Sequence, residues 1–406
     1  MAVYTYQGRA ADGKKADGVL RAADRAAAQA ELKRRSIAVT SLAERKAGGG
    51  GGGLFAPSPK ARAADIAVFT RQLSTMISAG IPLLESLEIL HEQCTEPGFR
   101  IALDRIIDKV RSGSDFSTAL SDYPKCFSKI YVNMVKAGEA SGQLDTILNR
   151  LAEYLEATEE LKREIKAAMT YPVISLCLIL AITIGLIVGV VPRFKLIFEQ
   201  LQMKELPLPT EILLAVSDTM KRNFFFFILG FVILIVAFLL YIRTNMGRRQ
   251  WHWVCFHMPV FGPLFRKVAI SRFSRTFATL IQSGVPMLGA LDIVAGTAGN
   301  VLVEDAVLRA KEAVARGETL GDPLAATKIF PPMVTRMISI GEKTGAIEKL
   351  LLKISEFYDQ EVRATVKALT SLIEPIMIAV MGCIVAGIVL SIFLPILKIQ
   401  QQLTGS

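Results

Sequence analysis

The motif Gly-Glu-x-x-Gly occurs twice in this chain, at 138–142 and at 341–345. Glycine permits a tight turn or a close approach of two backbones. The carboxylates of Glu139 and Glu342 would either meet a partner protein or sit at a helix corner, where a helix dipole favours a negative charge. Both interpretations stay open for the motif residues, which are Gly138, Glu139, Gly142, Gly341, Glu342 and Gly345.

The second copy of the motif superficially resembles a phosphate-binding loop. A Walker A loop requires glycine directly before lysine, whereas Glu342 stands between Gly341 and Lys343. A run of six glycines at 48–53 is followed by no Lys-Ser or Lys-Thr pair, and it is typical of a flexible linker. We therefore expect no nucleotide-binding loop.

A cluster of two histidines and a cysteine, His252, Cys255 and His257, could hold a metal ion. These residues lie with Trp251 and Trp253 just on the inner side of the apolar stretch at 224–242, where aromatic residues mark the membrane–water interface. The chain has only three histidines, its five cysteines form no CxxC pair, and it contains neither HExxH nor GxSxG. We expect no catalytic residue, no cofactor and no metal, and therefore no enzyme.

The composition fits a membrane protein with sizeable folded modules. The 406 residues are 51% hydrophobic and 21% charged, with a net charge of +10. This excludes a disordered, collagen-like or disulfide-rich secreted chain. The basic excess is spread along the sequence, much of it beside apolar segments, so it favours a bilayer rather than nucleic acid as partner.

Three stretches lack Asp, Glu, Lys and Arg, namely 172–191, 224–242 and 375–397. Each approaches or exceeds the roughly 20 residues that a helix needs to cross a bilayer. No apolar signal segment precedes them in the opening residues MAVYTYQGRAADGKK. Lys and Arg are more numerous on the side that carries the N-terminus, which favours a cytoplasmic N-terminus.

A tandem repeat determines the predicted architecture. With an offset of 204, residues 69–90 match 273–294, so that Arg71 corresponds to Arg275. With an offset of 203, residues 134–148 match 337–351, and the prolines at 172 and 192 match those at 375 and 395. Each copy is a soluble module followed by a membrane span. Two copies of one module should lie on the same side of the membrane, and the unpaired middle span returns the chain to that side.

Apolar spacing in the first copy is helical throughout. We expect helices over 64–79 and 82–94, another from Pro97, a short one capped by Asp115, one over about 128–138, and one from near Gln143 that continues into the first span. The first 45 residues differ from the rest. A hairpin, a helix over Asp24 to Arg35 and a strand over Ile37 to Val39 would make a small α+β domain.

Several segments together resemble the GspF/PilC family of inner-membrane platform proteins of bacterial type II secretion and type IV pilus systems. They are FTRQLSTMISAGIPLLESLEIL (69–90), AGEASGQLDTIL (137–148) with GEKTGAIEKLL (341–351), the Tyr-Pro before the first span, and LPLPT (206–210) after it. The resemblance covers about 60–400, and the leading 45 residues resemble the family's small first domain.

The resemblance implies an all-α membrane protein with two tandem cytoplasmic six-helix bundles and three transmembrane helices. The expected domains are the small α+β domain (1–45), a Gly/Pro linker (46–60), the first bundle (61–170), span one (171–192), a periplasmic loop (193–223), span two (224–242), the second bundle (243–374), span three (375–397) and a periplasmic tail (398–406). The N-terminus would be cytoplasmic and the C-terminus periplasmic.

The resemblance also implies a non-enzymatic scaffold. Its expected partners are a cytoplasmic hexameric secretion or pilus ATPase, other inner-membrane components, pilin or pseudopilin subunits, the lipid bilayer and further copies of itself, with no nucleic acid. Arg71, Arg275 and the motif glutamates are candidates for partner contacts or structural corners. The alternative is a transporter or channel built from repeated helical units. It is disfavoured because the repeats are parallel and the spans carry no Asp, Glu, Lys, Arg or His.

Overall fold

The computed structural model describes residues 2–10, 15–22, 29, 32, 37–45, 58–200 and 206–404. The chain divides into two compact units, Met1–Ser58 and Pro59–Ser406. The larger unit is helical in its described part and contains three long apolar helices.

The smaller unit contains a three-stranded antiparallel sheet in the order β2-β1-β3. Its strands are β1 (Ala2–Ala10), β2 (Lys15–Ala22) and β3 (Ile37–Arg45). In the hairpin of β1 and β2, Tyr4 lies opposite Leu20. The third strand is longer than the predicted Ile37 to Val39. The predicted helix over Asp24 to Arg35 falls outside the described residues except for two positions, and the predicted Gly/Pro linker at 46–60 falls outside them except for its last three residues.

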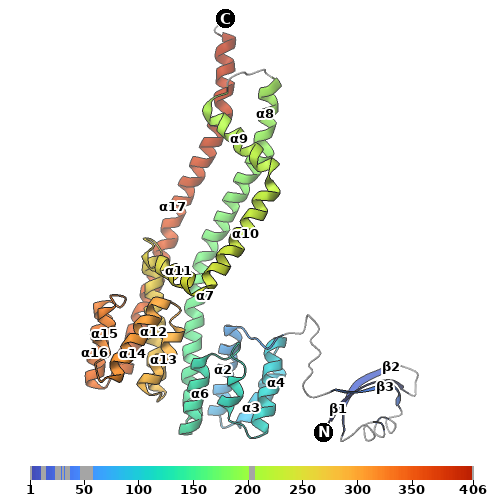
Figure 1. The fold of residues 1–406 in the computed structure, drawn as a ribbon, viewed down its shortest axis with the longest axis vertical. Coiled ribbons are helices and arrows are strands. Elements are labelled where there is room, and N and C mark those ends of the chain that lie inside the picture. Colours follow the sequence, from blue (N-terminus) through green and yellow to red (C-terminus); the bar gives the residue numbers. More distant parts are fainter. Residues whose placement is uncertain are drawn as a thin grey trace. The chain divides into compact units, whose positions relative to one another are not determined.

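The first helical module consists of α2 to α6 and the N-terminal part of α7 (Figure 1). The helices are α2 (Ala63–Ser78), α3 (Leu83–Gln93), α4 (Pro97–Arg111), α5 (Phe116–Ser121), α6 (Lys129–Ser141) and α7 (Leu144–Gly185). Helix α6 runs three residues past the predicted end at 138. The continuous α7 confirms that the last helix of the module passes directly into the first span.

The second helical module repeats this order of long and short helices. It consists of α12 (Gly262–Gln282), α13 (Met287–Thr297), α14 (Val301–Ala315), α15 (Gly321–Ala326), α16 (Pro332–Thr344) and the start of α17 (Ile347–Thr404). Repeat-equivalent side chains are buried in both modules. These pairs are Phe69 with Phe273, Leu73 with Phe277, Leu87 with Leu291, Leu103 with Val307, and Leu148 with Leu351.

An aromatic contact is also repeated in the two cores. Phe69 meets Phe127 edge-on with ring centroids 6.2 Å apart, and the equivalent Phe273 meets Phe330 at 4.9 Å. Edge-to-face pairs of this kind add roughly 0.5–1.5 kcal/mol beyond the burial of their area. The sequence repeat therefore corresponds to the same core packing in both modules.

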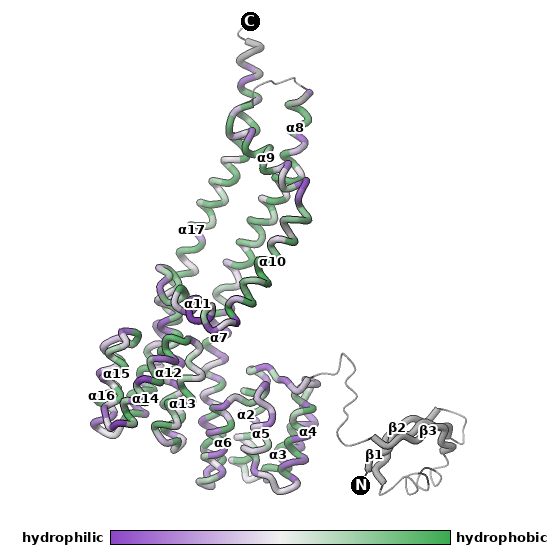
Figure 2. Tube along the Cα trace, viewed as in Figure 1, coloured by the Kyte–Doolittle hydropathy of each residue, from purple (hydrophilic) through white to green (hydrophobic). Residues whose placement is uncertain are grey.

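Three helical segments are long and apolar enough to cross a membrane: Leu144–Phe198, Phe224–Arg243 and Ile347–Lys398. Figure 2 shows hydrophobic residues along α10 (Phe224–Arg243) and along the parts of α7 and α17 that extend beyond the modules. The first segment contains a π-helical turn, η1 (Leu186–Val190), and continues as α8 (Val191–Gln200). The three predicted spans are confirmed as candidate membrane helices.

The connection between the first two spans is more helical than the predicted loop at 193–223. Helix α8 extends to Gln200, and α9 (Leu208–Arg222) follows. Thr210 Oγ1 donates to the Ser391 carbonyl oxygen at 2.6 Å, and Ser217 Oγ donates to the Ile187 carbonyl oxygen at 2.6 Å. These bonds join α9 to α17 and to η1, where the π-turn leaves a carbonyl available. Helix α17 likewise continues to Thr404, past the predicted end of the span at residue 397.

Candidate functional site

Each glutamate of the repeated motif caps a short helix of its own module. Glu139 Oε1 accepts from Phe116 N at 2.6 Å and its Oε2 from Ser117 N at 3.0 Å, at the start of α5. Glu342 Oε2 accepts from Leu320 N at 2.8 Å, at the start of α15. The first backbone N–H groups of a helix have no partner within the helix, and a carboxylate there also meets the positive end of the dipole.

This arrangement differs from the predicted cap. Asp115 occupies the N-cap position of α5, but its side chain makes no capping hydrogen bond. The carboxylate comes instead from Glu139, in the last turn of α6. Glu139 therefore caps an earlier helix of its module, α5, and not the helix that follows it. Because the bond joins residues more than 20 positions apart, it holds α5 against α6.

The glycines of the motif have two separate uses. A Cβ on Gly138 would lie 3.0 Å from Ile147 Cβ, and one on Gly341 would lie 2.8 Å from Ile347 Cα, so each glycine lets the next helix approach closely. Gly142 and Gly345 both have φ of +69° and end their helices in the left-handed conformation, which glycine adopts without strain. Together they form a tight corner between α6 and α7, and between α16 and α17.

Arg71 and Arg275 make equivalent ion pairs. Arg71 Nε and Nη2 donate to the two carboxylate oxygens of Glu156 at 2.7 and 2.6 Å, and Nη1 donates to Asn149 Oδ1 at 2.7 Å. In the second module Arg275 donates to Asp359, which also accepts from Ser271. Each pair joins the first helix of a module to its last.

The two ion pairs differ in exposure and electrostatics. The side chains of Arg71 and Glu156 are 35% and 46% exposed, against 17% and 14% for Arg275 and Asp359. The hydrogen bond from Arg71 lowers the pKa of Glu156 below its ordinary value, and the same bond raises the pKa of Arg71; desolvation opposes both shifts. The acidic partners were missed in the sequence, although Glu156 and Asp359 obey the 203-residue offset.

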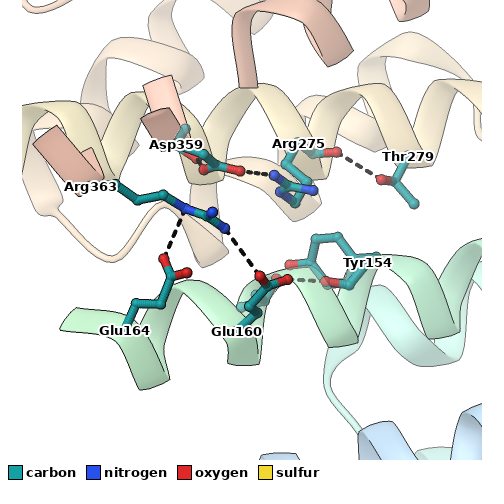
Figure 3. A network of polar contacts seen from close by, with 9 residues as sticks. Tyr154, Glu160, Glu164, Arg275, Thr279, Asp359 and Arg363 are labelled. Carbon is teal, nitrogen blue, oxygen red and sulfur yellow. Dashed lines mark hydrogen bonds and ion pairs between the residues drawn. The ribbon is translucent and has the colours of Figure 1, made fainter. Parts of the chain in front are cut away.

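The two modules contact each other along α7 and α17. Arg363 of α17 donates to Glu160 at 3.2 Å and forms an ion pair with Glu164 at 2.8 Å, both on α7 (Figure 3). Tyr154 and Thr276 share a hydrogen bond of 3.2 Å between their hydroxyls. Beside these bonds lies a small buried apolar cluster of Leu161, Leu264, Val362, Val366 and Leu369.

Glu160 and Arg363 are repeat-equivalent positions, 203 residues apart, yet they carry opposite charges and pair with each other. Glu164 and its equivalent Lys367 differ in the same way. Two identical first modules would place glutamates against glutamates here, and like charges repel. The divergence of charge therefore favours contact between one first module and one second module.

The histidine and cysteine cluster lies on α11 (Asn245–His257), where Cys255 is buried and both histidines have other contacts. His252 Nδ1 accepts from Val301 N at 2.9 Å, and burial lowers its pKa. His257 Nδ1 lies 2.8 Å from the Trp253 carbonyl oxygen. Trp251 meets Phe238 of α10 edge-on at 5.1 Å. Among the described residues, no group of three or more His, Cys, Asp or Glu side chains is placed to hold a metal ion.

Comparison with known proteins matches both helical modules and the first unit. The family model described as type II secretion system (T2SS), protein F matches twice, over 69–192 and 273–395. The model of the N-terminal domain of the same protein matches 1–43. The two matches begin 204 residues apart and end 203 apart, in agreement with the repeat.

Individual relatives cover nearly the whole chain. The type IV pilus assembly protein PilC of Myxococcus xanthus is 42% identical over 400 residues, which is 98% of this chain and 95% of that protein. PilC of Thermus thermophilus is 43% identical over 402 residues, 98% of each. The type II secretion system protein F of Vibrio cholerae is 31% identical over 407 residues, the full length of both.

These matches account for the duplicated modules, the three apolar helices and the small leading sheet. They confirm the resemblance noted in the sequence, and with it a scaffold rather than an enzyme. The chain belongs to the GspF/PilC family, the non-enzymatic inner-membrane platform proteins of type II secretion and type IV pilus systems.

Proposed function

We propose that this chain is the platform of a type IV pilus machine and that it links a cytoplasmic hexameric ATPase to pilin subunits in the membrane. The degree of similarity supports the pilus assignment, since PilC of Myxococcus and of Thermus share 42% and 43% of residues with this chain, and the secretion proteins F of Vibrio and of Pseudomonas aeruginosa share 31% and 34%. The ATPase would supply the energy, and this chain would provide the surface on which membrane-embedded subunits are added.

The contact between the modules carries the proposed topology. The contacts of Arg363 with Glu160 and of Tyr154 with Thr276 support a topology in which both modules lie on one face of the bilayer and α10 is the returning span. We infer a cytoplasmic N-terminus and a periplasmic C-terminus. The proposed domains are a small α+β domain (1–45), a linker (46–60), bundles at 61–170 and 243–374, spans at 171–192, 224–242 and 375–397, and periplasmic segments at 193–223 and 398–406.

The motif residues have a structural role in this proposal. Glu139 and Glu342 accept hydrogen bonds from backbone N–H groups of their own module, and Arg71 and Arg275 have carboxylate partners of their own. They would therefore shape the bundle surfaces that an ATPase recognises without forming the contact themselves. Further copies of the chain would complete the assembly.

Deletion of the gene, followed by complementation, tests the assignment. We expect loss of surface pili, restored by the wild-type chain, while protein export through any type II secretion system continues. Affinity purification of the complemented chain should recover a hexameric ATPase, and removal of residues 61–170 should abolish that recovery. Normal piliation in the deletion strain would refute the proposal, as would loss of protein export with pili intact.

A further inference from the structure

A cavity of about 640 Å³ opens where the two modules meet the membrane helices. Its walls come from α7, α11 and α12, and from residues 298–300 between α13 and α14. Figure 1 shows α11 at the foot of α10, next to α12. The volume lies within the range of about 300–1,000 Å³ that is usual for small-ligand sites. Neither the family matches nor the relatives assign a function to it.

The lining of the cavity is apolar with a basic edge. Apolar side chains come from each of the three helices, among them Leu161, Met169, Phe256, Leu264, Phe265 and Val268. Four lining residues are Lys or Arg and none is Asp or Glu. An apolar volume with positive charge alone at its edge suits an amphiphile with an anionic group.

Two of the four basic side chains are available for a ligand. Lys162 pairs with Glu159 at 3.1 Å, and Arg275 pairs with Asp359. Lys166 and Arg272 make no ion pair within the described part of the chain, and both are exposed. They come from different modules, Lys166 from α7 and Arg272 from α12, so a ligand that contacts both would bridge the modules.

The cavity lies at the depth of lipid headgroups. Met169 and Lys166 precede the apolar stretch that starts at Pro172 by three and six residues, which is about 4.5 and 9 Å along a helix. The headgroup layer extends roughly 5–8 Å beyond each side of the hydrocarbon core, and a lysine side chain can reach into it. Trp251, also in the lining, packs edge-on against Phe238 of α10 and so ties this wall to the second span.

We propose that this cavity binds an anionic phospholipid. An acyl chain lies among the apolar side chains, and the phosphate contacts Lys166 and Arg272. A free phosphate would leave most of the apolar volume unfilled, whereas a phospholipid fills it and enters from the adjoining bilayer. The bound lipid thereby links the first module to the second at the membrane surface.

The test measures which lipid stays with the full-length chain. The protein is reconstituted in nanodiscs of phosphatidylcholine with a minor fraction of phosphatidylglycerol, and lipid retained after detergent extraction is counted by native mass spectrometry. We expect preferential retention of phosphatidylglycerol. Its affinity should fall about 30-fold in K166Q/R272Q, the factor for two basic contacts to anionic lipid. Equal retention of the two lipids by the wild-type chain would overturn the proposal.

A matched control removes the same charges elsewhere. Arg100 and Lys136 are exposed residues of the first module without an ion pair among the described residues, so R100Q/K136Q should retain phosphatidylglycerol like the wild-type chain. Ala157→Phe narrows the cavity from the α7 wall and should weaken retention without a change of charge. An equal loss in the control, or full retention in either cavity variant, would contradict the assignment. Displacement by inorganic phosphate would overturn it in favour of a simple anion site.

Discussion

Replacement of Glu139 by alanine tests the capping role of the motif most sharply. The change removes both oxygens that accept from Phe116 N and Ser117 N, while the polar environment of α5 is otherwise unchanged. Loss of a helix cap costs about 0.5–2 kcal/mol, and hydrogen bonds to a charged group contribute about 1.5–3 kcal/mol each. Because water can replace part of the loss at this half-buried site, we expect local opening of α5 to become easier by about 2 kcal/mol.

Hydrogen exchange of the full-length chain, followed by mass spectrometry of peptides covering 116–121, measures this opening directly. A change of about 2 kcal/mol corresponds to exchange that is about 30-fold faster. Glu342 accepts from only one backbone N–H, that of Leu320. Glu342→Ala should therefore have a smaller effect at 320–326 than Glu139→Ala has at 116–121.

The control is Glu92→Ala, which removes an exposed carboxylate of α3 and should leave exchange at 116–121 unchanged. Membrane insertion should be normal in all three variants, because no span is altered. Wild-type exchange at 116–121 in Glu139→Ala would refute the capping role. Faster exchange throughout the module in the Glu92 control would show that any lost charge has this effect.

Three further perturbations follow from the contacts of the modules. Arg71 lowers the pKa of Glu156. This pair therefore stabilises the fold above the ordinary carboxylate pKa of about 4.3, and the stabilisation is lost as pH falls through the lowered pKa. Glu156→Gln should reduce stability by at most about 1 kcal/mol for so exposed a pair, and thermal unfolding at low pH should show no difference from the wild-type chain. Arg363→Glu should loosen the α7–α17 contact and speed hydrogen exchange at 154–166, and Glu160→Arg together with Glu164→Arg in the same chain should restore protection, because both glutamates face position 363; no recovery in the triple variant would contradict the pairing. Gly341→Ala places a methyl group 2.8 Å from a backbone carbon of the next helix, so it should cost about 1–3 kcal/mol and lower the thermal midpoint; an unchanged midpoint would show that the corner can yield.

The sequence predicts the elements of the helical modules well because the repeat supplies two independent views of each element. Apolar spacing over Ile66, Phe69 and Leu73 matches that over Ile270, Phe273 and Phe277, and all six are buried. A pattern that recurs at a fixed offset reflects a fold that is formed twice. The spans are equally well predicted, since apolar runs of this length without charged residues are typical of transmembrane helices.

The capping partner of Glu139 could not be read from local patterns. Asp115 has the residue type and the position of an N-cap, whereas the bond actually formed depends on the approach of α6 to α5. The repeat contained a signal for this contact, because the donor residues Ser117 and Leu320 lie 203 residues apart, as the acceptors Glu139 and Glu342 do. Helix α9 was missed although Pro209 near its start and Lys221 with Arg222 at its end are ordinary helix boundary signals.

The placement of both modules on one side of the membrane is the central claim, and site-directed labelling tests it directly. In a chain freed of its native cysteines, Ser112→Cys and Arg316→Cys mark exposed loops of the first and second module, and Arg222→Cys marks the end of α9. A membrane-impermeant maleimide added to intact spheroplasts should label only the Arg222 position, and all three after the membrane is opened. Labelling of exactly one module in intact spheroplasts would contradict the account.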